Sequence, residues 1–260
     1  MPADDLRLIF GEDPELYDRA RPGYPAELFI DLAELADIGP RSRVAEIGPG
    51  TGQATAALIA RGANVVAVEL ASPLAVVLQR KLGRDSVEVV VSAFEDWQLP
   101  VEPFDTLACF TSWHWLDAAI RTSKAATALR KGGALVTITT FHVLGGNVEF
   151  FTQVQNCYEQ WDPSTLGGVR LQAADTIPAA VDEVDDSEVF LPAVRRRYQQ
   201  EVVYSTRAYL EVLATYSGHR ALSAAQRHGL LGCIGELIDG NYGGTITKRY
   251  LYELRVAQRR

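Results

Sequence analysis

The stretch Val44-Ala45-Glu46-Ile47-Gly48-Pro49-Gly50-Thr51-Gly52-Gln53 decides the fold. It joins an apolar, strand-like run at 43–47 to a segment of helical character at 53–60. Glycines permit positive φ and let a ligand approach the backbone closely, and a helix N-terminus adds unpaired N–H groups. Because ligands of open parallel sheets bind at the carboxyl ends of strands, we expect a ligand at this loop.

The spacing of the glycines and two acids indicates the class of ligand. A dinucleotide fingerprint reads G-x-G-x-x-G, whereas here the third glycine is Gly52, position 53 is Gln, and Glu46 has no counterpart in that rule. Glu69 ends the second strand-like run, where a carboxylate accepts from both ribose hydroxyls and repels a 2′-phosphate. The pattern favours an adenosine-containing ligand; the alternatives are a ligand-free glycine turn and a solvated glutamate.

Apolar runs alternate with helical segments from Arg43 to about Thr140, and Gly83 and Gly132-Gly133 suit helix ends. The expected strands are 43–47, 65–69, 87–91, 106–110 and 134–140, and the expected helices are 53–60, 73–82 and 118–129. This order predicts an α/β fold with a doubly wound, mostly parallel sheet and right-handed crossovers.

The flanking regions have a different character. Residues 13–37 are expected to be helical, with a break at Arg21–Pro25. After Gly145-Gly146 we expect helices at 148–161, 206–216 and 224–238, an irregular stretch at 162–184, a strand near the end of 189–204, a turn at 241–244 and a last strand at 245–257. The sequence therefore predicts three regions: an N-terminal helical segment (1–40), a ligand-binding core (41–145), and a helical cap with final strands (146–260).

Composition limits the function. The 260 residues carry 25 basic and 33 acidic side chains, a net charge of −8, which disfavours nucleic acid as a partner. Three cysteines without a C-x-x-C pair predict neither a disulfide nor a zinc site, and they fit a reducing cytoplasm. The acidic start lacks the features of a signal peptide, and no apolar run has the roughly 20 residues of a membrane helix.

The sequence resembles the class I S-adenosylmethionine-dependent methyltransferases, and within them the trans-aconitate-type small-molecule enzymes. The resemblance rests on Tyr17–Pro25, similar to a Y-x-x-x-R-P-x-Y-P lead-in, on Glu46–Gly52 with Glu69, on Ser92–Trp97, and on Phe104-Asp105, Trp113–Asp117 and Leu129–Leu135. It implies a seven-stranded Rossmann-like methyltransferase fold, S-adenosylmethionine as cofactor and S-adenosylhomocysteine as product.

The resemblance also implies roles for single residues. Tyr17 and Arg21 would close over the site, and Leu70 would pack on the adenine beside Glu69. The full set of implied cofactor residues is Tyr17, Arg21, Glu46, Gly48, Gly50, Gly52, Gln53, Glu69, Leu70, Ala93, Phe94, Glu95, Thr111 and Ser112. Many relatives carry Asp at the position of Ser92, so here Glu95 or a backbone carbonyl would accept from the adenine amino group.

The methyl acceptor cannot be deduced from a motif, because methyl transfer mainly requires alignment and exclusion of water. His114, after the fourth strand, is the candidate catalytic base, with packing between Trp113 and Trp115 as the alternative. His142 is a second candidate. No metal site is expected. We expect a small-molecule acceptor, no nucleic acid or membrane partner, and a monomer or homodimer. The alternatives are a non-catalytic S-adenosylmethionine-binding protein and a dinucleotide-dependent oxidoreductase.

Overall fold

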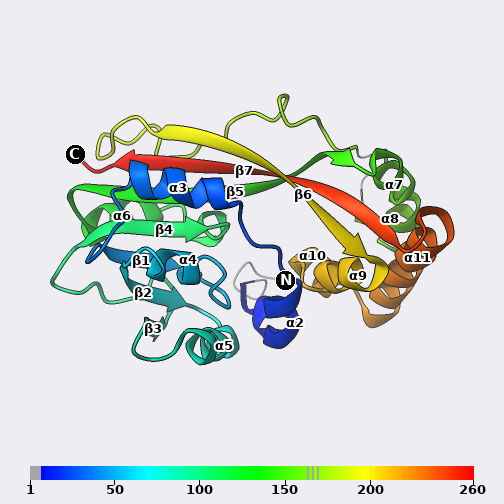
Figure 1. Ribbon diagram of the computed structural model, residues 1–260, viewed down its shortest axis with the longest axis horizontal. Helices are drawn as coiled ribbons and strands as arrows, with labels where there is room; N and C mark the ends of the chain where they lie inside the picture. The colour runs from blue at the N-terminus through cyan, green and yellow to red at the C-terminus, as the bar shows by residue number, and fades with distance from the viewer. Residues whose placement is uncertain (1–6, 163, 166, 169) are drawn as a thin grey trace. The chain divides into compact units, whose positions relative to one another are not determined.

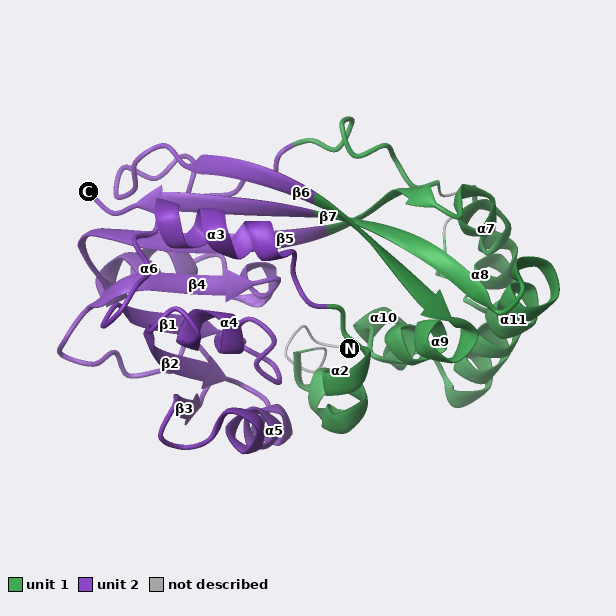
Figure 2. Cartoon of the chain, in the orientation of Figure 1, with its two compact units in different colours: residues 1–22, 141–178, 199–251 green, residues 23–140, 179–198, 252–260 purple. Residues whose placement is uncertain are grey.

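The computed structural model describes residues 7–260 apart from 163, 166 and 169, and it divides into two compact units (Figure 2). Unit 1 comprises residues 1–22, 141–178 and 199–251, and unit 2 comprises residues 23–140, 179–198 and 252–260. Each unit is thus assembled from three separated segments of the chain. The three regions predicted from the sequence follow chain order and stay a prediction.

A seven-stranded sheet of order β3-β2-β1-β4-β5-β7-β6 is the framework of the chain (Figure 1). Its strands are β1 (Arg43–Ile47), β2 (Asn64–Glu69), β3 (Glu88–Val91), β4 (Phe104–Phe110), β5 (Leu129–Gly146), β6 (Val194–Ser205) and β7 (Thr245–Gln258). β1 pairs in parallel with β2 and β4, β2 with β3, and β4 with β5. The predicted fold class, with its mostly parallel sheet of seven strands, is confirmed.

β7 runs antiparallel to β5. The amide of Gly132 donates to the carbonyl of Arg259, whereas the amide of Asn147 donates to the carbonyl of Thr247, so the two strands advance in opposite directions. β6 lies at the edge of the sheet, beyond β7. β7 is the last strand of the sequence but an internal strand of the sheet, because β6 covers the edge that β7 would otherwise present.

β5 is longer than the seven residues expected, and Gly132-Gly133 lie inside it instead of ending a helix. The register with β4 shifts after the pair Phe104–Leu129 and resumes at Thr106–Ala134. A β-carbon on Gly133 would meet the carbonyl oxygens of Arg130 and Asp105 at 2.9 and 3.0 Å, so this irregularity requires glycine. The helix before β5, α6 (Arg121–Ala128), ends one residue earlier than expected.

Helices of unit 2 cover the parallel strands. They are α3 (Ala26–Leu35), α4 (Thr55–Ile59), α5 (Ser72–Leu82) and α6 (Arg121–Ala128), together with the 3-10 turn η2 (Trp113–Trp115). α3 packs through Phe29, whose ring stacks on Phe110 of β4 at 5.7 Å. The core below includes Phe94, Trp97 and Phe104, all buried. Burial of these apolar faces fixes the strand ends that form the candidate site.

Unit 1 is mainly helical. It contains η1 (Ile9–Glu12), α2 (Pro14–Ala20), α7 (Val148–Gln153), α8 (Gln155–Trp161), α9 (Thr206–Ala214), α10 (Ser217–Ala221) and α11 (Ala224–Tyr242). The helix expected at 148–161 is interrupted at Val154, whose carbonyl accepts from Cys157 in a tightened turn. α11 starts with a Ser223–Gln226 capping box and ends at Gly243, whose φ is +62°. Among the described helices, none is long and apolar enough to cross a bilayer.

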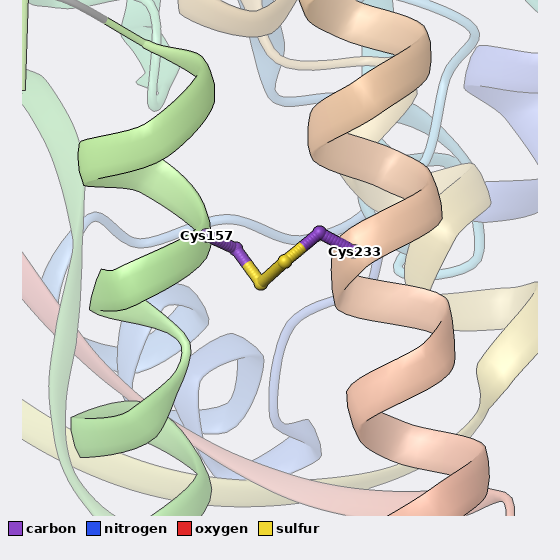
Figure 3. The surroundings of a disulfide bond; sticks show 2 residues. All are labelled: Cys157 and Cys233. Atoms are coloured by element: carbon purple, nitrogen blue, oxygen red, sulfur yellow. A yellow bond between two sulfur atoms is a disulfide. The ribbon is translucent and has the colours of Figure 1, made fainter.

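A disulfide joins Cys157 of α8 to Cys233 of α11 (Figure 3). The prediction that the cysteines stay unpaired is wrong. The two residues are 76 positions apart in sequence, but the packing of α8 against α11 brings their Cα atoms to 5.8 Å, within the usual range for a disulfide. Cys109, buried in β4, is the remaining free cysteine. The cytoplasmic location inferred partly from unpaired cysteines stays a prediction.

Candidate cofactor site

The loop between β1 and α4 has the backbone that its glycines predicted. Gly48, Gly50 and Gly52 have φ values of +66°, +62° and +88°, a region that other residues rarely adopt. A β-carbon on Gly48 would lie 2.8 Å from Cβ of Ser112, so the loop also packs too closely against the end of β4 for a side chain. The glycines thus allow a close approach to the backbone where the first strand ends.

Glu69, at the carboxyl end of β2, is held in place by this loop. Its Oε2 accepts from the amide of Gly50 at 2.9 Å, and its Oε1 accepts from the amide of Ala71 at 2.8 Å. The side chain is 5% exposed. The two amides fix the orientation of the Glu69 carboxylate at the end of β2.

Glu46 is the unusual residue of this site. It is fully buried on β1, and neither of its carboxylate oxygens has a hydrogen-bond partner among the described residues. Burial, with a smaller contribution from Glu69, raises the pKa of its carboxyl to about 7. The nearby Thr55 hydroxyl opposes this rise, although it does not reach hydrogen-bonding geometry. A buried acid without a donor is costly, and a ligand with a positive amino group would supply the missing donor.

The loop after β3 contributes backbone more than side chains. The amide of Ser92 donates to the carbonyl of Glu69, which links the ends of β3 and β2. The side chain of Phe94 belongs to the hydrophobic core, 1% exposed, so only its backbone is available to an adenine ring. Oε1 of Glu95 accepts from the amide of Asp117. Ala93 is half-buried, as is Leu70 after β2.

The end of β4 carries Thr111 and Ser112. Thr111 has a φ of +58°, unusual for a β-branched residue and typical of strain kept at functional positions. Its hydroxyl bonds Thr140 at 2.9 Å and the phenol of Tyr24 at 3.2 Å. Ser112 donates to the carbonyl of Ile47 at 2.5 Å. Tyr24 was not among the predicted site residues, although it lies within the quoted Tyr17–Pro25 segment.

Gln53 lies before α4 instead of at its start, because the helix begins at Thr55. Its side-chain amide donates to the hydroxyl of Thr51 at 2.9 Å. Lys81 donates to the carbonyl of Thr51 and so fixes the same turn. Both contacts hold the turn before α4. Gln53 itself is half-buried.

Tyr17 and Arg21 belong to unit 1, whereas the other predicted cofactor residues belong to unit 2. Within unit 1 the Arg21 guanidinium lies 5.0 Å from the ring centre of Tyr17 and 4.8 Å from that of Tyr216, and it donates to the carbonyl of Thr215. Its buried Nε has no partner in the part of the chain described. Their role as a lid over the cofactor stays a prediction.

The two candidate catalytic histidines differ in surroundings. His114 lies in η2, the turn that follows Ser112, and its ring is 5.0 Å from that of Trp115. Its side chain keeps an exposed surface, and enclosure by protein followed by the Arg121 charge lowers its pKa. A neutral imidazole is the form that acts as a base. His142 lies in unit 1, among cations and tyrosines.

The segment that contains this loop matches known proteins. Residues 45–137, all within unit 2, match the family model described as a methyltransferase domain. An uncharacterized methyltransferase of Mycobacterium tuberculosis is 34% identical over 131 residues, 50% of this chain and 51% of that protein. One of Geobacillus is 30% identical, over 51% of this chain and 66% of that protein. The chain spans about half the length of the mycobacterial relative it matches.

Solved structures show the same fold. The YcgJ protein of Bacillus subtilis superposes with a TM-score of 0.54 at 15% identity, over 91% of this chain and 99% of that one. An S-adenosylmethionine-dependent methyltransferase of Thiobacillus denitrificans, in complex with S-adenosylhomocysteine, gives 0.51 at 13% identity, over 93% and 94%. The chain therefore has the Rossmann-like methyltransferase fold, with the matched domain around the Gly48–Gly52 loop.

Proposed function

We propose that this chain is an S-adenosylmethionine-dependent methyltransferase that acts on a small-molecule acceptor. The observation that carries the proposal is the pair of buried acids around the glycine loop. Glu46 lacks a hydrogen-bond donor among the described residues, and Glu69 is oriented by two backbone amides at the end of β2. The methionine amino group and the ribose hydroxyls of the cofactor supply donors for these two carboxylates.

S-adenosylmethionine supplies a methyl group already activated by a positive sulfur, so the protein mainly binds, orients and excludes water. Glu46 and the glycine loop hold the methionine part, and Glu69 with Leu70 holds the adenosine. Thr111, fixed by Tyr24 and Thr140, shapes the floor after β4. His114 is the candidate base for an acceptor whose oxygen or nitrogen carries a proton.

The small size of the acceptor is supported by the net charge of −8, which is unfavourable for nucleic acids, and by the resemblance to the trans-aconitate-type group. A cytoplasmic location and a monomeric or homodimeric state are part of the proposal.

Isothermal titration of the wild type with S-adenosylmethionine, S-adenosylhomocysteine and NAD tests the cofactor. We expect binding of the first two and no heat from NAD. Glu69→Ala should weaken cofactor binding by about 1–3 kcal/mol, the range for a charge-assisted hydrogen-bonding group. Glu88→Ala, on the exposed start of β3, is the matched control and should bind like the wild type.

Binding of NAD alone would refute the cofactor assignment. A folded Glu69→Ala variant with wild-type affinity would refute the ribose contact alone. Circular dichroism of each variant establishes that it is folded before it is titrated.

A further inference from the structure

Unit 1 contains a cluster of cations and tyrosines that the cofactor site does not use. Its members surround the ring of Tyr250 on β7. They are Lys248, His142, Tyr204, Tyr216 and Tyr250. Among the described residues, no carboxylate contributes to the pKa of Lys248 or of His142. Within the cluster, Lys248 is therefore a positive charge without a counter-ion among the described residues.

Lys248 is the central observation. It is 6% exposed, and it has no hydrogen bond or ion pair with any described residue. Its Nζ lies 4.6 Å from the ring centre of Phe151 and 5.6 Å from that of Tyr250. Burial lowers its pKa to about 8. Lysines are rarely this buried without a partner. The Nζ of Lys248 is not fully enclosed, so an anion can reach it.

His142 adds a second basic group to the same surface. Its ring is 5.6 Å from that of Tyr250 and 5.7 Å from that of Tyr216. The side chain keeps an exposed surface, although protein packed around the ring and the charges of Lys248, Arg21 and His219 lower its pKa. The charged groups that act on His142 are all cationic and disfavour its protonation. An anion bound here would offset them and favour the protonated imidazole.

The tyrosines supply neutral donors. The hydroxyls of Tyr204 and Tyr250 are 3.0 Å apart, and both residues are buried. Arg21 lies over the ring of Tyr216 and adds a positive charge beside it. Phenolic O–H groups beside a lysine and a histidine are suited to an oxyanion, which accepts several hydrogen bonds at once.

We propose that Lys248, His142 and the phenol of Tyr216 form a binding site for a carboxylate or phosphate group of the methyl acceptor. The presence of an oxyanion site in unit 1 is independent of the proposed function; its assignment to the acceptor rests on that function. The site selects small anionic acceptors and disfavours cationic amines, which would meet the like charge of Lys248. The cofactor has a carboxylate of its own, so the test separates the two sources.

The experiment is isothermal titration of the full chain with citrate, inorganic phosphate, glycerol and S-adenosylmethionine. Lys248→Met removes the charge while keeping an apolar chain of similar length against Phe151. Lys131→Met, at an exposed position of β5, is the matched control. We expect the wild type to bind citrate or phosphate but not glycerol, and Lys248→Met to bind that anion at least about tenfold more weakly. S-adenosylmethionine affinity should stay unchanged in both variants.

Preference for citrate or for phosphate identifies the anionic group. Failure of the wild type to bind either anion up to about 10 mM, beyond the millimolar range of weak binding, overturns the site, as does a folded Lys248→Met variant with wild-type anion affinity. Loss of S-adenosylmethionine binding in Lys248→Met assigns the site to the cofactor carboxylate and overturns the proposal. Anion binding without cofactor binding refutes the proposed function alone.

Discussion

Glu46 is a residue whose position lowers the stability of the folded chain at neutral pH. Its carboxylate is fully buried on β1 without a hydrogen-bond donor among the described residues, and burial raises its pKa to about 7. The folded-state pKa exceeds the unfolded value of 4.5. The contribution of this group to stability is therefore fully present below pH 4.5 and is lost as the pH rises through 7.

Glu46→Gln should make unfolding less dependent on pH over this range. Near pH 4.5 the free energy of unfolding of the variant should match that of the wild type, and above pH 7 it should exceed it by up to about 3 kcal/mol, from 1.36 kcal/mol per pKa unit. Urea unfolding at both pH values measures the difference. Titrations of histidines such as His142 are common to both proteins and cancel.

Glu88→Gln, at an exposed position, should show no such difference. We also expect Glu46→Gln to bind S-adenosylmethionine more weakly, because an amide carries no charge for the amino group. Equal stability of variant and wild type at pH 8 would contradict the buried, unpartnered carboxylate.

Other single residues show what local sequence can and cannot reveal. The positive φ of the three glycines and the places of Glu46 and Glu69 beside their loop were predictable, because fixed spacing ties them to it. Their contacts with a ligand stay a prediction. Phe94 was expected beside the adenine, yet its side chain lies in the core, since a sequence does not tell which side of a strand end an aromatic ring takes. Tyr24 was missed because its hydrogen-bond partner Thr111 lies 87 residues away in the chain.

Several elements were predicted almost to the residue. β1 was expected at 43–47 and is found there, and α5 and β7 differ from expectation by one residue. Continuous apolar runs and helix caps are local signals, so they are readable. β5 was underestimated because its outer residues pair with β7, more than a hundred positions later in the chain.

The disulfide between α8 and α11 should stabilise unit 1. It closes a loop of 76 residues, and such a cross-link typically contributes about 2–4 kcal/mol by restricting the unfolded chain. Reduction with dithiothreitol should therefore lower the free energy of unfolding of the wild type by that order, measured by urea unfolding with and without the reductant.

Cys233→Ser provides the control, because it should unfold like the reduced wild type and should not respond to dithiothreitol. A wild type whose stability is unchanged by reduction, with complete reduction verified by thiol titration, would contradict a stabilising tether.

At the scale of the whole molecule, the predicted cofactor residues are divided between the two units. Tyr17 and Arg21 lie in unit 1, and the remainder lie in unit 2. Hydrogen exchange with and without S-adenosylhomocysteine should show slower exchange at 48–53, and also at 17–21 because these residues are predicted to close over the cofactor. Peptides from α8 and α11 serve as the internal reference. Protection confined to unit 2 would contradict the predicted lid.

The sequence by itself determined the parallel core, the glycine loop and the two acids, because strands, caps and close-approach glycines depend on neighbours within a few positions. Only the tertiary structure decided the Cys157–Cys233 pairing, the place of β7 inside the sheet and the cluster around Lys248. Those features depend on residues far apart in the chain that come together only when helices and strands pack, and no local pattern specifies which distant partner a side chain meets.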